Sequence, residues 1–327
     1  MTPSYTLCLS AGCPSGVGPE VAVRALSTFE APDVRVILIG DAGSLHDAAR
    51  AAGLRLLELP GVTLRAVSAL APHDRVAGSP SDAGGRAQLA AVDLAADLCL
   101  SGAADAMVTG PVSKRAITAS GFPFLGHTEH LAQRCGVERV VMMFAGPKLR
   151  TSLVTTHRAI ARLSADITRE AVRDSVLITA RALVTRFGLF SPRIVVCGLN
   201  PHAGEAGLIG REEIDVIAPA LDEARAALGG GFELVGPMGA ESAYRKARDG
   251  RFDAVVAMFH DQATIASKLL DFGDAVNVTL GLPIIRTSVD HGTGADIAGR
   301  GVAEPGGMIA ALELALHLVE QRRRVGR

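Results

Sequence analysis

Short apolar runs alternate with amphipathic stretches along nearly the whole chain of 327 residues. Short apolar runs bounded by turn residues predict strands, and apolar residues spaced three and four apart predict helices. The predicted strands are Tyr5–Ser10, Val34–Ile39, Ala106–Thr109, Arg150–Thr155, Arg193–Gly198 and Ala254–Met258. The predicted helices include Pro19–Phe29, Gly85–Ser101, Thr168–Phe187 and Glu212–Leu228. Strands that alternate with helices indicate an α/β protein, in which a mostly parallel sheet is covered on both faces.

The stretch that begins at Thr168 gives the clearest helix signal. Thr168 is placed to cap the helix N-terminus, and Glu170 lies in the first turn, where a negative charge is favourable. Val172, Val176, Ile178 and Leu183 supply one apolar face. We therefore predict that this helix packs with that face against the sheet.

Composition excludes several classes of function. The formal net charge is −1, from 33 basic and 34 acidic residues, and the chain has no Trp and only two Tyr. Neither a basic surface nor an aromatic platform for nucleic acid is indicated. Five cysteines without a C-x-x-C pair favour a reducing compartment. The N-terminus has no signal-peptide pattern, and no apolar stretch reaches the ~18 residues needed to span a bilayer. A soluble, cytoplasmic protein that acts on a small molecule is predicted.

Three histidines lie where an apolar run ends in a polar turn: His157, His202 and His260. Parallel sheets place their ligands at the carboxyl ends of the strands, so three imidazoles at one edge would form a divalent-metal site. Each histidine can equally be a hydrogen-bonded structural residue. Asp261 is either a fourth ligand or a carboxylate that orients His260. Three histidines suit zinc, cobalt, nickel or iron, whereas magnesium would depend on carboxylates.

Two glycine-rich segments are candidate phosphate-binding loops. Gly12 and Gly16 lie in a turn between a predicted strand and a predicted helix, and such a turn either binds a phosphate or only reverses the chain. The second segment, Asn277–Gly301, holds five glycines together with Arg286, Asp290, His291 and Asp296. Glycine permits close approach of the backbone to a ligand, so we interpret the second segment as a nucleotide- or phosphate-binding loop.

At these segments the sequence resembles the 4-hydroxythreonine-4-phosphate dehydrogenase family, which comprises NAD-dependent enzymes of pyridoxal phosphate synthesis and their paralogues. The matching blocks occur in the family's order over almost the whole chain. They are Pro14–Glu20, Gly126–Ala132, Val154–Ala159, Gly198–Glu205, Gly236–Tyr244, Asp253–Gln262 and Lys268–Gly299. The resemblance implies two α/β subdomains with mostly parallel sheets, as in isocitrate and isopropylmalate dehydrogenases, with the active-site cleft between them. It assigns 1–130 and 287–327 to the nucleotide side, and 131–286 to the metal ligands and the dimer interface.

The resemblance also implies roles for single residues. It makes His157, His202 and His260 the metal ligands. The substrate-binding positions that it implies are His127, Thr128, Glu241, Lys268, Asn277 and Arg286. The positions expected to bind NAD or NADP are Gly12, Gly16, Asp290, His291, Gly292, Thr293 and Asp296. The family further implies a homodimer whose partner subunit completes the metal site.

The chain departs from the family pattern at a few positions of the expected substrate cleft. Cys13 replaces an acidic residue, Glu241 and Ser242 replace an Asp-Thr pair, and Tyr244 replaces a Phe. These changes leave open three dehydrogenase branches, which act on 4-phosphohydroxy-L-threonine, on terephthalate 1,2-cis-dihydrodiol, or on 4-phospho-erythronate and -threonate. They also motivate a fourth interpretation, that the chain is a non-catalytic metal- or nucleotide-binding relative.

The reaction that the resemblance implies is oxidation of a secondary alcohol by hydride transfer to NAD, followed by decarboxylation. Lys268 and Asp261 are the candidates for the proton-transfer group. Lys268 can instead only bind an anion, and Asp261 can only orient His260. Arg286 suits bidentate recognition of a phosphate or carboxylate, with an ion pair to an acid such as Asp290 as the structural alternative.

Overall fold

The computed structural model describes residues 4–271 and 273–326. Residues 1–3, Phe272 within the block Lys268–Gly299, and Arg327 lie outside the described residues. The chain divides into two compact units, Met1–Glu138 with Leu282–Val319, and Arg139–Gly281 with Glu320–Arg327. We expected the borders near residues 130 and 286. The first unit additionally holds residues 131–138 and 282–286, which include the end of helix α5 (His127–Arg134) and the start of strand β11 (Ile285–Ser288).

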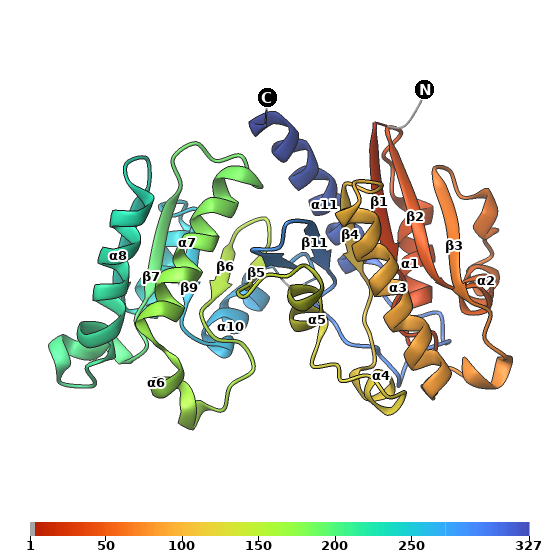
Figure 1. The fold of residues 1–327 in the computed structure, drawn as a ribbon, viewed down its shortest axis with the longest axis horizontal. Coiled ribbons are helices and arrows are strands. Elements are labelled where there is room, and N and C mark those ends of the chain that lie inside the picture. Colours follow the sequence, from red (N-terminus) through yellow and green to blue (C-terminus); the bar gives the residue numbers. More distant parts are fainter. Residues whose placement is uncertain (1–3, 272, 327) are drawn as a thin grey trace. The chain divides into compact units, whose positions relative to one another are not determined.

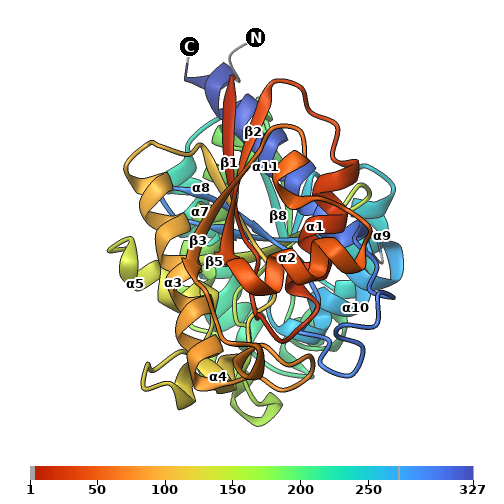
Figure 2. The same cartoon turned by 90° about the vertical axis from the view of Figure 1, so that its right-hand side faces the viewer.

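The first unit is built on a parallel sheet with the strand order β3-β2-β1-β4-β11. Helix α3 covers one face of this sheet, and α1 and α2 cover the other (Figure 2). The strands are β1 (Tyr5–Ser10), β2 (Val34–Asp41), β3 (Val62–Ser68), β4 (Ala106–Thr109) and β11 (Ile285–Ser288). The helices are α1 (Gly18–Thr28), α2 (Ala42–Ala51), α3 (Asp82–Leu100), α4 (Lys114–Ala119), α5 (His127–Arg134) and α11 (Gly306–Val325), whose last turn clusters with the second unit.

The second unit holds strands in the order β10-β5-β6-β9-β7-β8. The pairs of β5 with β10 and with β6 are antiparallel, and the remaining pairs are parallel. The strands are β5 (Val141–Ala145), β6 (Arg150–Leu153), β7 (Arg193–Cys197), β8 (Glu233–Met238), β9 (Ala254–Ala257) and β10 (Val276–Leu280). The helices are α6 (Leu163–Asp166), α7 (Arg169–Thr185), α8 (Ala218–Leu228), α9 (Ala240–Arg248) and α10 (His260–Leu270) (Figure 1).

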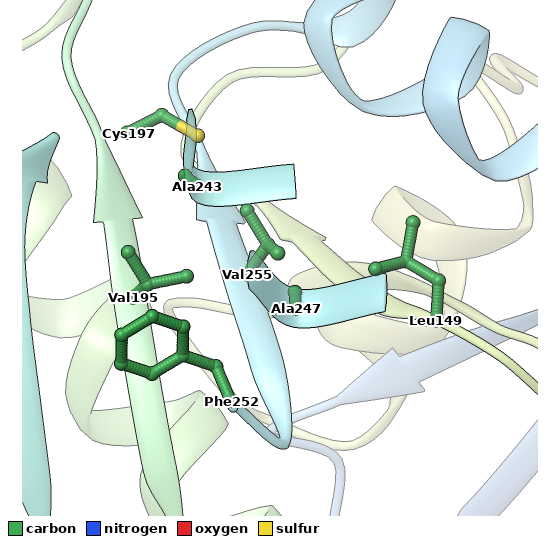
Figure 3. Close-up of a cluster of buried hydrophobic side chains, with 7 residues drawn as sticks. All are labelled: Leu149, Val195, Cys197, Ala243, Ala247, Phe252 and Val255. Atoms are coloured by element: carbon green, nitrogen blue, oxygen red, sulfur yellow. The ribbon is translucent and has the colours of Figure 1, made fainter. Parts of the chain in front are cut away.

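A compact apolar cluster shows how the second unit is held together. Ala243 and Ala247 of α9 pack onto Val195 of β7 and Val255 of β9, and Phe252 lies beside them (Figure 3). Two alanines on one helical face let the helix approach the sheet closely, and the larger strand side chains fill the space between. The buried strands thereby fix where their carboxyl ends, and the residues that follow, are placed.

The prediction of an α/β fold with a mostly parallel sheet is confirmed, and so is the cap of α7. The Thr168 side chain accepts a hydrogen bond from the Ala171 backbone N–H at 3.1 Å. Val172, Val176 and Leu183 are buried, whereas Ile178 is only half-buried.

The interpretation of Asn277–Gly301 as one ligand-binding loop is wrong for its first half. Residues 276–280 and 285–288 form strands β10 and β11, and most of their side chains are buried. Arg286, Thr287 and Ser288 are polar but lie in the interior, because strand pairing satisfies their backbone and neighbouring groups bind their side chains. Residues 281–284 form the turn between the two strands, and the part from residue 289 onward forms a loop.

Candidate active site

Arg286 is the most deeply buried charged side chain among the predicted site residues, at 2 % exposed. It lies on β11 beside β4, and its Nε and Nη2 both donate to the Thr109 Oγ1, at 3.1 and 2.7 Å. Burial lowers the pKa of its guanidinium to about 9, although the nearby Glu129 carboxylate opposes the shift. The group is therefore still a cation at neutral pH, held in the interior of the first unit.

His127 begins helix α5 in the same unit. Its Nε2 is buried and has no hydrogen-bond partner among the described residues. Burial holds the pKa of this imidazole well below its usual value, and the positive charge of Arg286 acts in the same direction. The ring is therefore neutral at pH 7, with a ring nitrogen that still needs a partner. Thr128, the next residue of α5, is half-buried.

Helix α5 is attached to helix α3 by two side-chain contacts. His130 Nε2 lies 2.6 Å from Asp93 Oδ1, and Arg134 donates to both carboxylate oxygens of Asp97, at 3.0 and 2.6 Å. A bidentate arginine–carboxylate pair fixes the relative orientation of the two side chains as well as their distance. The contacts hold the helix whose first two residues are His127 and Thr128.

The glycine-rich turn after β1 packs directly against the loop after β11. The Val17 N–H donates to the Thr293 carbonyl at 2.8 Å, and a Cβ on Gly16 would lie 2.7 Å from the same oxygen. Gly12 has φ +84°, and a Cβ there would lie 2.3 Å from the Pro111 carbonyl oxygen. Glycine is thus required at both positions by close backbone approach. The structure brings the predicted cofactor residues Gly12, Gly16 and Thr293 together.

The remaining predicted cofactor residues follow along the same loop. Asp290 is half-buried, whereas His291, Gly292 and Asp296 are exposed. His291 Nδ1 lies 2.9 Å from the Gly292 carbonyl oxygen.

A cavity of 660 Å³ opens beside these loops, wholly within the first unit. Gly16 and Gly299 line one part of it, and helices α1 and α2 line another. Arg75, which forms an ion pair with Asp47, also lies on its wall. The volume falls within the range of ~300–1,000 Å³ typical of small-molecule and cofactor sites.

Two of the three predicted metal ligands come together in the second unit. His157 follows β6 and His260 begins α10 directly after β9, and these two strands are parallel neighbours. Their ring centroids are 5.5 Å apart, and both rings line a pocket of 140 Å³. Asp261 lines the same pocket, with its Oδ1 2.8 Å from His260 Nδ1. A carboxylate on one ring nitrogen and a free site on the other is the usual arrangement of a metal-bound histidine.

His202 lies on a separate turn of the same unit, Pro201–Gly207, and is exposed. Across residues 4–271 and 273–326, no three His, Cys, Asp or Glu side chains of the single chain form a group that could hold a metal. The structure therefore brings His157 and His260 together and does not bring His202 to them.

The other predicted substrate residues are distributed over the second unit. Asn277 on β10 is half-buried, and its Oδ1 is buried with no partner among the described residues. Lys268 lies in the last turn of α10, exposed and two helical turns beyond Asp261. Glu241 on α9 is exposed and accepts hydrogen bonds from Ser242 and Arg245, which lower the pKa of its carboxyl.

Cys13, which replaces an acidic residue of the family pattern, is buried at 1 % exposed. Burial raises the pKa of its thiol, so this position of the turn is neutral rather than negative.

Comparison with known proteins identifies the family. The sequence profile of the pyridoxal phosphate biosynthetic protein PdxA matches residues 32–315. The chain belongs to the PdxA family. The 4-hydroxythreonine-4-phosphate dehydrogenase of Burkholderia vietnamiensis is 46 % identical over 324 residues, which cover 97 % of each protein.

Solved structures of PdxA-like proteins show the same fold. The 4-hydroxythreonine-4-phosphate dehydrogenase of Klebsiella pneumoniae superposes with a TM-score of 0.85 at 33 % identity, over 97 % of this chain and all of that one. A terephthalate 1,2-cis-dihydrodiol dehydrogenase of Burkholderia xenovorans, at 32 % identity, gives a TM-score of 0.68 over 96 % of this chain and 98 % of that one. These relatives are thus dehydrogenases, and the similarity extends over almost the whole length of both chains. None of the helices that the structure describes is long and apolar enough to cross a membrane.

Several residues that shape the site were missed by sequence reasoning. Thr109 was predicted only as the last residue of a strand, yet it holds Arg286. Asn200 and Glu213 hold the turn that carries His202. Thr109 and Asn200 are polar residues at the carboxyl ends of strands, and that position was the one signal that could have singled them out.

Proposed function

We propose that this PdxA-family protein oxidises 4-phosphohydroxy-L-threonine with NAD and a divalent metal ion, and that decarboxylation follows. The observation that carries the proposal is the buried cation Arg286 in the same unit as His127, whose buried Nε2 has no hydrogen-bond partner among the described residues. The planar guanidinium of a buried arginine binds a phosphate or carboxylate through two N–H groups, so this place in the fold fits the charged end of the substrate. The Burkholderia vietnamiensis relative, which is 46 % identical, is a 4-hydroxythreonine-4-phosphate dehydrogenase, and this supports the choice of substrate.

Each of these residues would have a distinct task. Arg286, oriented by Thr109, would bind the substrate's charged end through its guanidinium. His127 stays neutral at pH 7, so with its proton on Nε2 it would donate one hydrogen bond without adding a second buried charge. In the second unit, Asn277 Oδ1, which has no partner among the residues that the structure describes, would accept from a donor of the substrate.

The two glycine loops and the cavity beside them fit a dinucleotide. At Gly16 a Cβ would collide with the Thr293 backbone, whereas at Gly292 it would meet no protein atom within 4 Å. Gly292 therefore presents open backbone, and Gly16 lines the cavity of 660 Å³ together with Gly299. We assign Gly12, Gly16, Asp290, His291, Gly292, Thr293 and Asp296 to cofactor binding. NAD bound there would accept the hydride.

The donor set of the second unit fits a divalent metal. His157 and His260 share one pocket, and Asp261 occupies the Nδ1 of His260, which leaves Nε2 for the ion. We propose His202 as the third ligand, with the site completed in a homodimer. Zinc, cobalt, nickel and iron all suit three imidazoles. A bound ion would lower the pKa of the substrate hydroxyl and hold the charge that develops on decarboxylation.

Lys268 is the stronger of the two candidates for taking the hydroxyl proton. Asp261 already contacts His260 at 2.8 Å and is best explained as the carboxylate that orients this ring. Lys268 lies two turns farther along the same helix, so Lys268 and Asp261 lie on the same face of α10.

The test is a substrate panel with the purified, metal-loaded enzyme, in which NADH absorbance is followed. Turnover of 4-phosphohydroxy-L-threonine supports the proposal. Reaction with terephthalate 1,2-cis-dihydrodiol alone, or with 4-phospho-erythronate alone, would assign the chain to another branch. Bound metal and NAD without turnover of any substrate would instead indicate a non-catalytic relative. In parallel, His157→Ala, His202→Ala and His260→Ala should each lose bound metal and activity while they keep the native circular dichroism spectrum.

A further inference from the structure

The turn that carries His202 has an unusual backbone. His202, Ala203, Glu205 and Ala206 have φ angles of 52°, 53°, 45° and 54°, and Gly204 between them has φ 79°. A run of five residues in the left-handed region is strained, because four of them carry a Cβ that crowds the following carbonyl oxygen. Such a conformation persists only where the surrounding structure enforces it.

A buried carboxylate holds the start of this turn. Glu213 is 3 % exposed, and its two oxygens accept from Asn200, one from the backbone N–H at 2.7 Å and one from the side-chain amide at 2.9 Å. The Asn200 amide also donates to Glu212 at 2.7 Å, and Glu212 in turn accepts from Ser164. Asn200 lies two residues before His202, so these bonds fix the direction in which the chain enters the strained turn.

The space around Glu213 is shaped for this carboxylate. A Cβ on Gly198 would lie 2.9 Å from Glu213 Oε1, and a Cβ on Gly204 would lie 2.6 Å from Glu213 Oε2. The carboxylate thus sits between the end of β7 and the centre of the strained turn, in contact distance of both backbones. Glu213 also opens a π-helical turn, Glu213–Ile217, ahead of α8, and such turns are frequent at functional sites.

We propose that Glu213 is the positioning residue for His202: it anchors the left-handed turn through Asn200 and so holds the imidazole where it can bind a metal ion. This inference rests on the proposed role of His202 as a metal ligand. Groups that orient metal ligands typically change metal affinity by ~10–100-fold when they are replaced. Glu213 would act in the same way, through the backbone rather than through the ring.

The experiment uses the full-length protein after its metal has been removed. Its affinity for Co²⁺ is measured by calorimetry and by the visible absorption of bound Co²⁺. Glu213→Gln keeps the size of the side chain but presents an NH₂ group to a donor of Asn200, so at least one bond is lost. The dissociation constant should rise ~10–100-fold. Glu205→Gln is the matched control, because it removes one carboxylate charge from the turn itself, at an exposed position. Its dissociation constant should stay within about threefold of the wild-type value, since no bond to Asn200 is changed.

Asn200→Ala provides a second variant, because it removes the side-chain amide with its bonds to Glu212 and Glu213 and keeps the backbone N–H bonded to Glu213. It should weaken Co²⁺ binding in the same direction and alter the visible spectrum. Wild-type affinity in either folded variant, while His202→Ala loses the metal, would overturn the inference and leave the proposed function standing. Unchanged affinity in His202→Ala would instead refute the metal role itself.

Discussion

Replacing Thr109 with valine tests whether one buried hydroxyl holds the central cation of the site. Thr109 is fully buried, and its Oγ1 accepts from both Nε and Nη2 of Arg286. Valine has nearly the same shape and favours a strand, so packing and propensity change little. The oxygen is lost, and a buried guanidinium is left with fewer acceptors. Both bonds end on one oxygen, so we count them as a single contact to a charged group, worth ~1.5–3 kcal/mol, and expect the free energy of unfolding to fall by about 2 kcal/mol.

The same change should alter substrate binding selectively. Without Thr109 Oγ1 the guanidinium is no longer held in one orientation, so KM for the phosphorylated substrate should rise about tenfold, which corresponds to ~1.4 kcal/mol. KM for NAD should not change, because the cofactor is assigned to the loops after β1 and β11. Thr109→Ser is the matched control: it keeps the acceptor oxygen and loses one methyl group, worth ~0.8 kcal/mol.

The assay combines urea unfolding with steady-state kinetics on the wild type and both variants. The reasoning predicts that Thr109→Val is less stable than Thr109→Ser and has the higher KM for substrate. A valine variant that is as stable as the serine variant would show that the Thr109 hydroxyl does not stabilise the buried Arg286. Equal effects on the KM values of NAD and substrate would show that the substitution disturbs the fold as a whole rather than the position of Arg286.

Three further predictions concern titration, the cofactor loop and assembly. Burial and Arg286 hold the pKa of His127 well below its usual value, so near pH 6.5 the imidazole takes up a proton in the unfolded chain but not in the folded one. The free energy of unfolding should therefore fall as the pH drops below about 6.5. His127→Asn should reduce that loss between pH 7 and 5 in urea titrations. Gly292→Ala should raise KM for NAD several-fold with no change in melting temperature, since a Cβ there meets no protein atom within 4 Å; unaltered NAD kinetics would remove Gly292 from the cofactor site. If a partner subunit completes the metal site, specific activity should fall on dilution together with the sedimentation coefficient, and a fully active monomer would contradict the shared site.

Local patterns in the sequence were enough for much of the fold. Strands β1 and β4 lie where apolar runs predicted them, and Thr168 caps α7 through its own side chain. These features depend on residues that are neighbours along the chain, so periodicity and capping reveal them. The motifs that carried the family resemblance were likewise readable, because each is a continuous block.

Only the tertiary structure decided which polar residues are interior and what holds them. The segment Asn277–Gly301 was interpreted as one ligand-binding loop, yet its first half forms strands β10 and β11, where neighbouring groups bind the side chains of Arg286 and Thr287. Arg286 is held by Thr109, which lies 177 residues earlier in the chain, and the turn of His202 is held by a carboxylate that follows it on another element. The physical reason is that the cost of burying a charge depends on partners supplied by the folded chain. The sequence shows which side chains are charged, but the packing of distant strands and turns determines which groups become their hydrogen-bond partners.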